Sequence, residues 1–181
     1  MNFIQNLLQL LSLFQLTLGC VIDPIPCTNL YVCPKIKEVT TCGVGGIMGH
    51  STYQLSVVVQ PNMNIQNVYA IYGDSNDNVM YWPPVYQMDG PFNSDIGGVS
   101  PSIITIYPEG EFDSWITVGV TDGDPHNKLS TIGIDFNAWN RGESITTSNG
   151  AVFLMDPTEI ISKKEYVIAQ VTLPSDELHR M

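Results

Sequence analysis

Residues 53–59 read YQLSVVV, an alternation of apolar and polar side chains that is followed by Pro61. A period of two residues is typical of a β-strand with one face turned to a core. Six further runs have strand character, and turn residues follow them: 67–72, 102–107, 114–120, 131–136, 151–155 and 166–173. No stretch after residue 20 shows sustained helical periodicity. The chain is therefore predicted to be all-β, a single antiparallel β-sandwich of the jelly-roll or Ig-like kind.

The charge of the chain argues against nucleic acid as a partner. The 181 residues carry a net charge of −11, and only 14% of them are charged. No Lys or Arg lies between Gly43 and Asn127, a stretch that holds nine of the carboxylates. Such a surface repels phosphate backbones and anionic lipid. The same acidity attracts Ca²⁺, or simply keeps a protein soluble.

The first 19 residues predict a signal peptide. Residues 7–18 are mostly Leu and Phe, which is the length of a secretory apolar region, and Thr17 and Gly19 are small residues before a cut at Cys20. The stretch has no basic start, and polar residues interrupt its apolar run. A membrane anchor and a buried helix are the alternatives, and an uncleaved leader is the one expected contact with a membrane. The expected localisation is secreted.

Four cysteines cluster in one short segment: Cys20, Cys27, Cys33 and Cys42. In a secreted protein such a cluster indicates two disulfides, for which three pairings exist. The spacings differ from the close cysteine pairs of zinc modules. The expected organisation is a signal peptide over 1–19, a disulfide-pinned Cys-rich segment over 20–46, the β-sandwich over 47–175 and a polar tail over 176–181.

The sequence contains no motif of a catalytic nucleophile or a metalloprotease. Its three histidines, His50, His126 and His179, stand outside any such motif. Glu109, Glu111 and Asp113 alternate along the chain, as two carboxylates of a glycosidase pair would on one strand face. Solvated acidic side chains explain the same pattern. No catalytic residue is therefore predicted, and a glycoside hydrolase is the weakest alternative.

Two loops rich in oxygen ligands are candidate calcium sites. Residues 74–78 read DSNDN, which matches the opening of an EF-hand loop but lacks its later Gly and bidentate Glu. The second loop is DGD at 122–124. The candidate ligands are Asp74, Asn76, Asp77, Asp122 and Asp124. The same residue types are ordinary in β-turns, so calcium is a candidate cofactor and no other is predicted.

An aromatic loop stiffened by prolines is the best candidate for binding a ligand such as a glycan. Residues 81–87 read YWPPVYQ, which sets aromatic faces beside an amide. The candidate residues are Tyr81, Trp82, Tyr86 and, farther along the chain, Trp139. A tryptophan that packs over the edge of the core is the alternative at each tryptophan position.

Several short strings mark the chain after residue 67: VYAIYG at 68–73, PPVYQ at 83–87, IGG at 96–98, FDSW at 112–115, TVG at 117–119, TDG at 121–123, IGIDF at 132–136, GAVF at 150–153 and AQVT at 169–172. This set resembles an uncharacterised extracellular β-rich repeat module found in secreted proteins of planctomycete-like bacteria and of algae such as diatoms. The resemblance implies a non-catalytic surface or matrix module, often one of several in a longer chain. The Cys-rich segment is not part of it.

The expected function is that of a secreted, non-enzymatic structural or interaction module of the extracellular space or cell surface. Its expected partners are extracellular-matrix proteins, cell-surface proteins or glycans. A carbohydrate-binding module, with calcium as an assisting ion, is the alternative.

Overall fold

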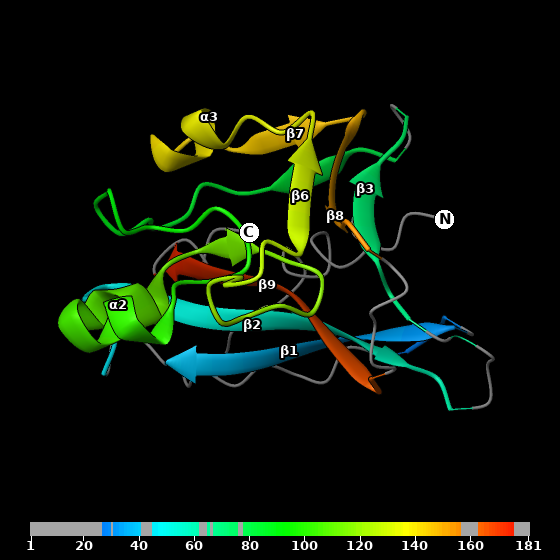
Figure 1. Ribbon diagram of the computed structural model, residues 1–181, viewed down its shortest axis with the longest axis horizontal. Coiled ribbons are helices and arrows are strands. Elements are labelled where there is room, and N and C mark those ends of the chain that lie inside the picture. The colour runs from blue at the N-terminus through cyan, green and yellow to red at the C-terminus, as the bar shows by residue number, and fades with distance from the viewer. Residues whose placement is uncertain are drawn as a thin grey trace.

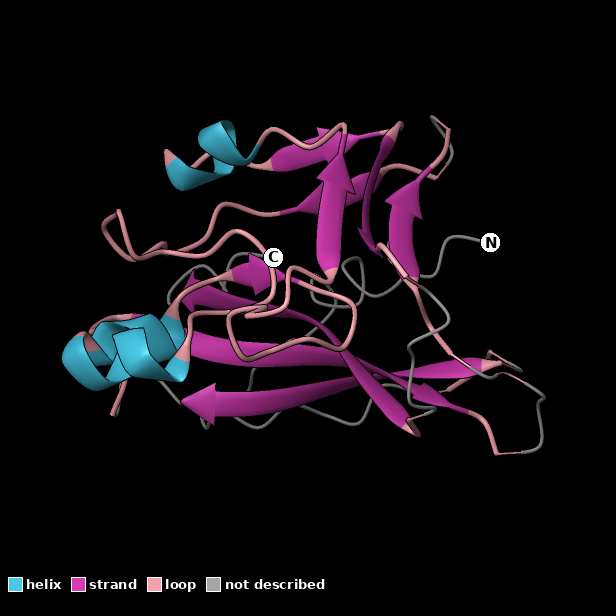
Figure 2. Cartoon of the chain, viewed as in Figure 1, coloured by secondary structure: helices cyan, strands magenta, loops and turns pink. Residues whose placement is uncertain are grey.

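The structure, a computed structural model, describes residues 27–29, 31–40, 45–61, 65, 67–75, 78–156 and 163–175. The signal peptide and the polar tail expected at the two ends lie outside these residues, as do Cys20, Cys42 and His179. The described part consists of two layers of β-sheet, with short helices at the periphery (Figures 1 and 2). None of the helices in the described ranges has the length and apolar character that a membrane crossing requires.

The first layer is one antiparallel sheet with the strand order β1-β2-β9-β5. Its strands are β1 (Val32–Thr40), β2 (His50–Val59), β9 (Glu165–Pro174) and β5 (Trp115–Ile116). Leu55 in β2 lies opposite Ile36 in β1 and opposite Ala169 in β9. Tyr53, Leu55 and Val57 all point into the core, as the alternation predicts. Residues 53–59 are thus paired with β1 on one side and with β9 on the other.

The second layer consists of a three-stranded and a two-stranded antiparallel sheet (Figure 1). The larger sheet has the order β3-β8-β6, and the smaller pairs β4 with β7: β3 (Ala70–Gly73), β8 (Gly150–Leu154), β6 (Leu129–Ile132), β4 (Met80–Trp82) and β7 (Ile145–Thr147). The two sheets approach closely at Gly73, where a Cβ would overlap the carbonyl oxygen of Thr147. Only glycine fits there.

The hydrophobic core joins the two layers. Leu55 and Ile168 from the first layer, Val152 and Trp82 from the second, and Trp139 from the segment between β6 and β7 are fully buried members of one cluster. Burial of each such side chain stabilises the fold by about 1.5–3 kcal/mol relative to exposure. The prediction of an antiparallel β-sandwich is therefore confirmed.

Residues 101–106 form a helix, so the strand predicted over 102–107 is wrong. They belong to α2 (Pro101–Ile106), and two further short helices are η1 (Pro108–Phe112) and α3 (Phe136–Asn140). Pro101 suits the first helical turn, because its φ is preset and its missing N–H leaves no bond unmade. The N–H groups of Ile103 and Ile104 both donate to the carbonyl of Ser100. β-branched composition favours strands, but none of the described strands pairs with this segment.

A disulfide joins Cys27 to Cys33, with the two Cα atoms 5.2 Å apart. Cys33 lies in β1, which is an edge strand of the first layer. The bridge therefore fastens the chain before β1 to the sheet, which confirms a disulfide-pinned N-terminal segment. At the end of the neighbouring strand, the Gln60 side chain donates to the Cys33 sulfur.

Candidate functional site

The two tryptophans expected at a glycan site are buried, so this part of the site prediction is wrong. Trp82 and Trp139 have no exposed surface, and Pro83 beside them is buried as well. The Nε1 of Trp139 donates to the Pro83 carbonyl at 2.9 Å, which joins α3 to the aromatic loop. A sugar platform needs an exposed ring face. These rings instead fill the core beneath the second layer.

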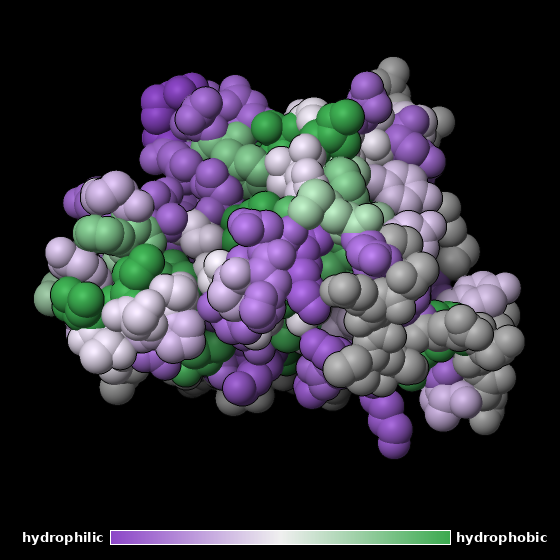
Figure 3. Space-filling model, viewed as in Figure 1, coloured by the Kyte–Doolittle hydropathy of each residue, from purple (hydrophilic) through white to green (hydrophobic). Residues whose placement is uncertain are grey.

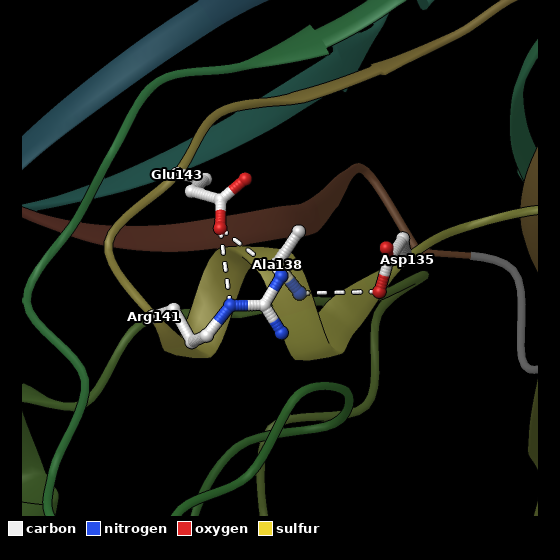
Figure 4. Close-up of polar contacts among 4 residues, drawn as sticks. All are labelled: Asp135, Ala138, Arg141 and Glu143. Carbon is white, nitrogen blue, oxygen red and sulfur yellow. Dashed lines mark hydrogen bonds and ion pairs between the residues drawn. The ribbon is translucent and has the colours of Figure 1, made fainter.

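Trp139 belongs to the helix α3, whose capping residues and following ion pair are drawn in Figure 4. Its cap is Asp135, whose carboxylate accepts the backbone N–H of Ala138 at 3.1 Å. Such a cap satisfies an N–H that the first helical turn leaves free. Just after the helix, Arg141 and Glu143 form an exposed ion pair at 3.0 Å. The polar groups therefore stay at the surface while the indole points inward.

The remaining two aromatic candidates differ in exposure. Tyr81 is 40% exposed on β4. Tyr86 is half-buried, and its backbone N–H donates to the Thr172 carbonyl in β9 at 2.8 Å. Burial raises the pKa of Tyr86, and the nearby Asp113, Glu109 and Asp89 raise it further. Tyr81 is thus the most exposed residue of the predicted quartet.

The described residues of the two calcium loops do not form a metal site. Asp74 and Asp122 are exposed, and Asn76 and Asp77 lie outside the described residues. The Asp124 carboxylate accepts the backbone N–H groups of Lys128 and Leu129 at 2.8 and 2.9 Å, so it braces its own turn. Across the described ranges, no group of three or more His, Cys, Asp or Glu side chains is placed to hold a metal ion.

The three alternating carboxylates separate into two environments. Glu109 and Glu111 are exposed on η1, whereas Asp113 is fully buried. One Asp113 oxygen accepts the Met88 N–H at 2.8 Å, and the other accepts the Ser94 N–H at 2.7 Å. Both oxygens are therefore committed to the backbone of the loop that follows the aromatic segment.

Burial raises the pKa of Asp113 to about 6. The backbone N–H donors of Met88, Ser94 and Ser114 oppose this rise, whereas the charge of Asp95 adds to it. Polar side chains of β9 support the same region. Gln170 donates to the Asp113 carbonyl at 2.9 Å, and Thr172 donates to the Phe112 carbonyl at 2.6 Å. Asp113 is thus the centre of a buried polar network that ties a long loop to the first layer.

The structure contains a cleft of about 290 Å³ that no sequence motif predicted. Four segments line it: 118–120 after β5, 126–128 before β6, 154–156 at the end of β8, and Lys163 with Tyr166 at the start of β9. Val118, Val120 and Leu154 give it an apolar wall. The Lys163 ammonium donates to the Gly119 carbonyl at 3.0 Å across the opening. We name this feature the Lys163 cleft.

The cleft is the main site that sequence reasoning missed. Its lining residues lie up to 48 positions apart, since Val118 and Tyr166 both contribute. The one usable signal is charge, because Lys128 and Lys163 are two of only seven Lys and Arg residues in the chain. His126, which stood outside any motif, also lines the cleft.

Comparison with known proteins gives no relative: no family model, no curated protein and no solved structure matches the chain. The resemblance to an extracellular repeat module therefore stays a prediction.

Proposed function

We propose that this chain is a secreted, non-enzymatic module that acts in extracellular structure or in interactions at the cell surface. The observation that supports this most is the disulfide between Cys27 and Cys33. Its Cα separation of 5.2 Å lies within the ordinary range for disulfides. Disulfides persist in oxidising compartments and are rare in the cytosol. The apolar leader is consistent with the same route.

The arrangement of the carboxylates supports a non-enzymatic role. A glycosidase holds two carboxyl groups toward one substrate, one of them free to transfer a proton. Asp113 has both oxygens bonded to backbone N–H groups, and it has no contact with solvent. Glu109 and Glu111 stand exposed on η1. Partners of the expected classes, matrix or surface proteins and glycans, would bind at the surface.

The disulfide gives the first test. We expect the full chain, expressed through a secretory pathway, to yield a Cys27–Cys33 link when it is digested with chymotrypsin and analysed by mass spectrometry. Cleavage after Tyr31 falls between the two cysteines, so the fragments stay joined until they are reduced. Replacing both cysteines by serine should lower the free energy of unfolding by about 2 kcal/mol, the loop-closure effect of so short a ring.

Ser102→Thr, a small change at an exposed position of α2, provides a folded control of unchanged stability. Recovery of the native chain from the cytosol with Cys27 and Cys33 both as thiols contradicts the proposal.

A carbohydrate-binding module is the second candidate, and exposed tyrosines on the second layer support it. Tyr72 in β3 is 59% exposed, and Tyr81 in β4 is 40% exposed. Tyrosine rings supply an apolar face and a polar hydroxyl, the combination that sugars pair with. The burial of Trp82 moves this candidate from the tryptophans to these two rings.

If this candidate is correct, Tyr81→Ala should weaken binding to a responsive polysaccharide on a glycan array by about tenfold, the loss of roughly 1.4 kcal/mol. Phe92→Ala, which removes an exposed aromatic ring on the α2 side, is the matched control and should leave binding unchanged. Parallel arrays with calcium and with EDTA test the calcium-assisted form. Failure to bind any polysaccharide on the array excludes this candidate.

A further inference from the structure

The end of the molecule that carries α2 presents an unusual apolar surface (Figure 3). None of the six residues of α2 is buried, and Ile106 is 69% exposed. Beside it, the rings of Phe92 and Tyr107 stack with their centroids 4.8 Å apart, and both are exposed. We name Phe92, Ile103, Ile106 and Tyr107 the α2 knob. Exposed apolar side chains that gather in one place mark interaction surfaces.

Exposed carboxylates lie close to this knob along the chain. Glu109 and Glu111 are exposed on η1, which directly follows α2, and exposed Asp89 belongs to the same loop as Phe92. The sequence between Gly43 and Asn127, which includes all three carboxylates, contains no Lys or Arg. The α2 knob is therefore an apolar tip with exposed carboxylates in the adjoining segments. Its complement is an apolar hollow with cations at the opening.

The Lys163 cleft has these complementary properties. Its wall includes Val118, Val120 and Leu154. Lys128 and Lys163 both line it, and Asp156 is the one carboxylate among the described lining residues. Among the described lining residues, two lysines thus stand against one carboxylate. The Lys163 ammonium carries three donors, one of which reaches the Gly119 carbonyl, and the side chain is exposed. The remaining donors of this ammonium can therefore bind a carboxylate of another molecule.

The size of the cleft favours a protein side chain as its occupant. At about 290 Å³ it lies just below the range of about 300–1,000 Å³ that is usual for small-molecule sites. An isoleucine or a tyrosine ring fits in such a space, and a longer saccharide does not. The α2 knob and the Lys163 cleft belong to different segments of the chain. The knob residues lie within 92–107, and the residues that line the cleft lie within 118–166.

We propose that copies of this chain associate head to tail, with the α2 knob of one copy seated in the Lys163 cleft of the next. Ile106 and Tyr107 would enter the apolar hollow, and Glu109 would meet Lys163. Because two different surfaces meet, the contact is heterologous and generates a ring or an open filament rather than a closed twofold dimer. This inference deepens the proposed function, and rests on it in treating the chain as an interaction module.

The test is the mass of the purified full chain as a function of concentration, measured by sedimentation velocity at physiological salt. We expect a concentration-dependent series of oligomers. Ile106→Asp and Lys163→Glu should each raise the dissociation constant by about tenfold or more, the effect of losing one central contact. Ile132→Asp is the matched control for the knob, since Ile132 in β6 is 65% exposed, and Lys37→Glu on β1 is the control for the cleft. Both controls should associate like the native chain.

Mixing the two defective variants separates head-to-tail association from other modes. The I106D chain keeps an intact cleft, and the K163E chain keeps an intact knob. An equimolar mixture should therefore form a one-to-one complex that grows no further, although each variant alone stays monomeric. Circular dichroism and thermal melts confirm that both variants are folded.

Carbodiimide crosslinking of a mixture of ¹⁴N- and ¹⁵N-labelled native chains should join Glu109 or Glu111 of one copy to Lys163 of another. Three outcomes overturn the inference: a native chain that remains monomeric at every concentration, which assigns the knob to a different protein or to a membrane; oligomers that K163E leaves intact; and a mixture that stays monomeric. A secreted, oxidised chain that remains monomeric overturns this inference and leaves the proposed function standing.

Discussion

Asp113→Ala is expected to lower the free energy of unfolding by about 3 kcal/mol or more, because the change leaves buried backbone N–H groups without an acceptor. Met88 and Ser94 donate to the two carboxylate oxygens at 2.8 and 2.7 Å, and no other side chain of the described ranges is bonded to these N–H groups. Each buried donor that loses its partner costs about 1–3 kcal/mol. Chemical denaturation followed by tryptophan fluorescence measures the loss.

Two further variants identify the cause. Asp113→Asn keeps one carbonyl oxygen as an acceptor and should recover part of the loss. Asp89→Ala removes an exposed carboxylate from the same loop and should change stability by no more than about 0.5 kcal/mol. A fully stable alanine variant is incompatible with a loop that depends on Asp113.

The Asp113 effect should also depend on pH. Burial raises the pKa of Asp113 from 3.8 to about 6 in the fold, so the unfolded chain loses this proton first as the pH rises. The folded state binds the proton more tightly, and the stability that Asp113 contributes is complete below about pH 4. It then declines through about pH 6 by up to about 3 kcal/mol. The difference in stability between the native chain and Asp113→Ala should therefore be larger at pH 4.5 than at pH 7.5. An opposite slope contradicts the raised pKa.

Trp139→Ala should lower the free energy of unfolding by about 3–5 kcal/mol, the usual cost of removing a large buried aromatic side chain. Trp139 is fully buried between α3 and the aromatic loop, and it joins them through its bond to the Pro83 carbonyl. If Trp139 or Trp82 were an exposed ligand platform, alanine would reduce binding and leave stability unchanged. A thermal melt distinguishes the two roles.

Phenylalanine variants isolate the hydrogen bond. Trp139→Phe loses the bond to Pro83 and should cost about 1 kcal/mol beyond the change in volume. Trp82→Phe removes an Nε1 that meets no acceptor within the described ranges, so its cost should be smaller. Tyr81→Ala, at an exposed position, is the surface control. Equal costs for the two phenylalanine variants contradict this role for the Trp139 bond.

The strands could be predicted where the sequence has its own period. Residues 53–59 and 166–173 lie in β2 and β9, which pair along nearly their whole length. The strands β4 and β7 were not predicted, because each has only three residues and stands beside turn-forming sequence. The segment 114–120 pairs as a strand only at Trp115 and Ile116, since Gly119 adopts a φ of 77° and turns the chain.

The edge strand β1 shows a second reason for a missed element. Its sequence includes a proline and two lysines, residues that interrupt an apolar alternation. On an edge strand these residues are favourable, because they hinder pairing with another sheet. A pattern that would exclude a central strand is therefore ordinary at the edge, and only the position in the sheet reveals which case applies.

By itself, the sequence determined the β class, the antiparallel pairing of its long alternating strands, the acidic character of residues 44–126 and the cysteine cluster. These properties follow from composition and from a period of two residues, which act locally. Tertiary structure alone decided which aromatic rings are buried, because YWPPVYQ has the same composition whether Trp82 points inward or outward. It also decided the partners of Asp113, since every residue except proline carries a backbone N–H and no sequence pattern marks the one that will donate. The Lys163 cleft belongs to this second group, because four distant segments form it only after the two layers have packed together.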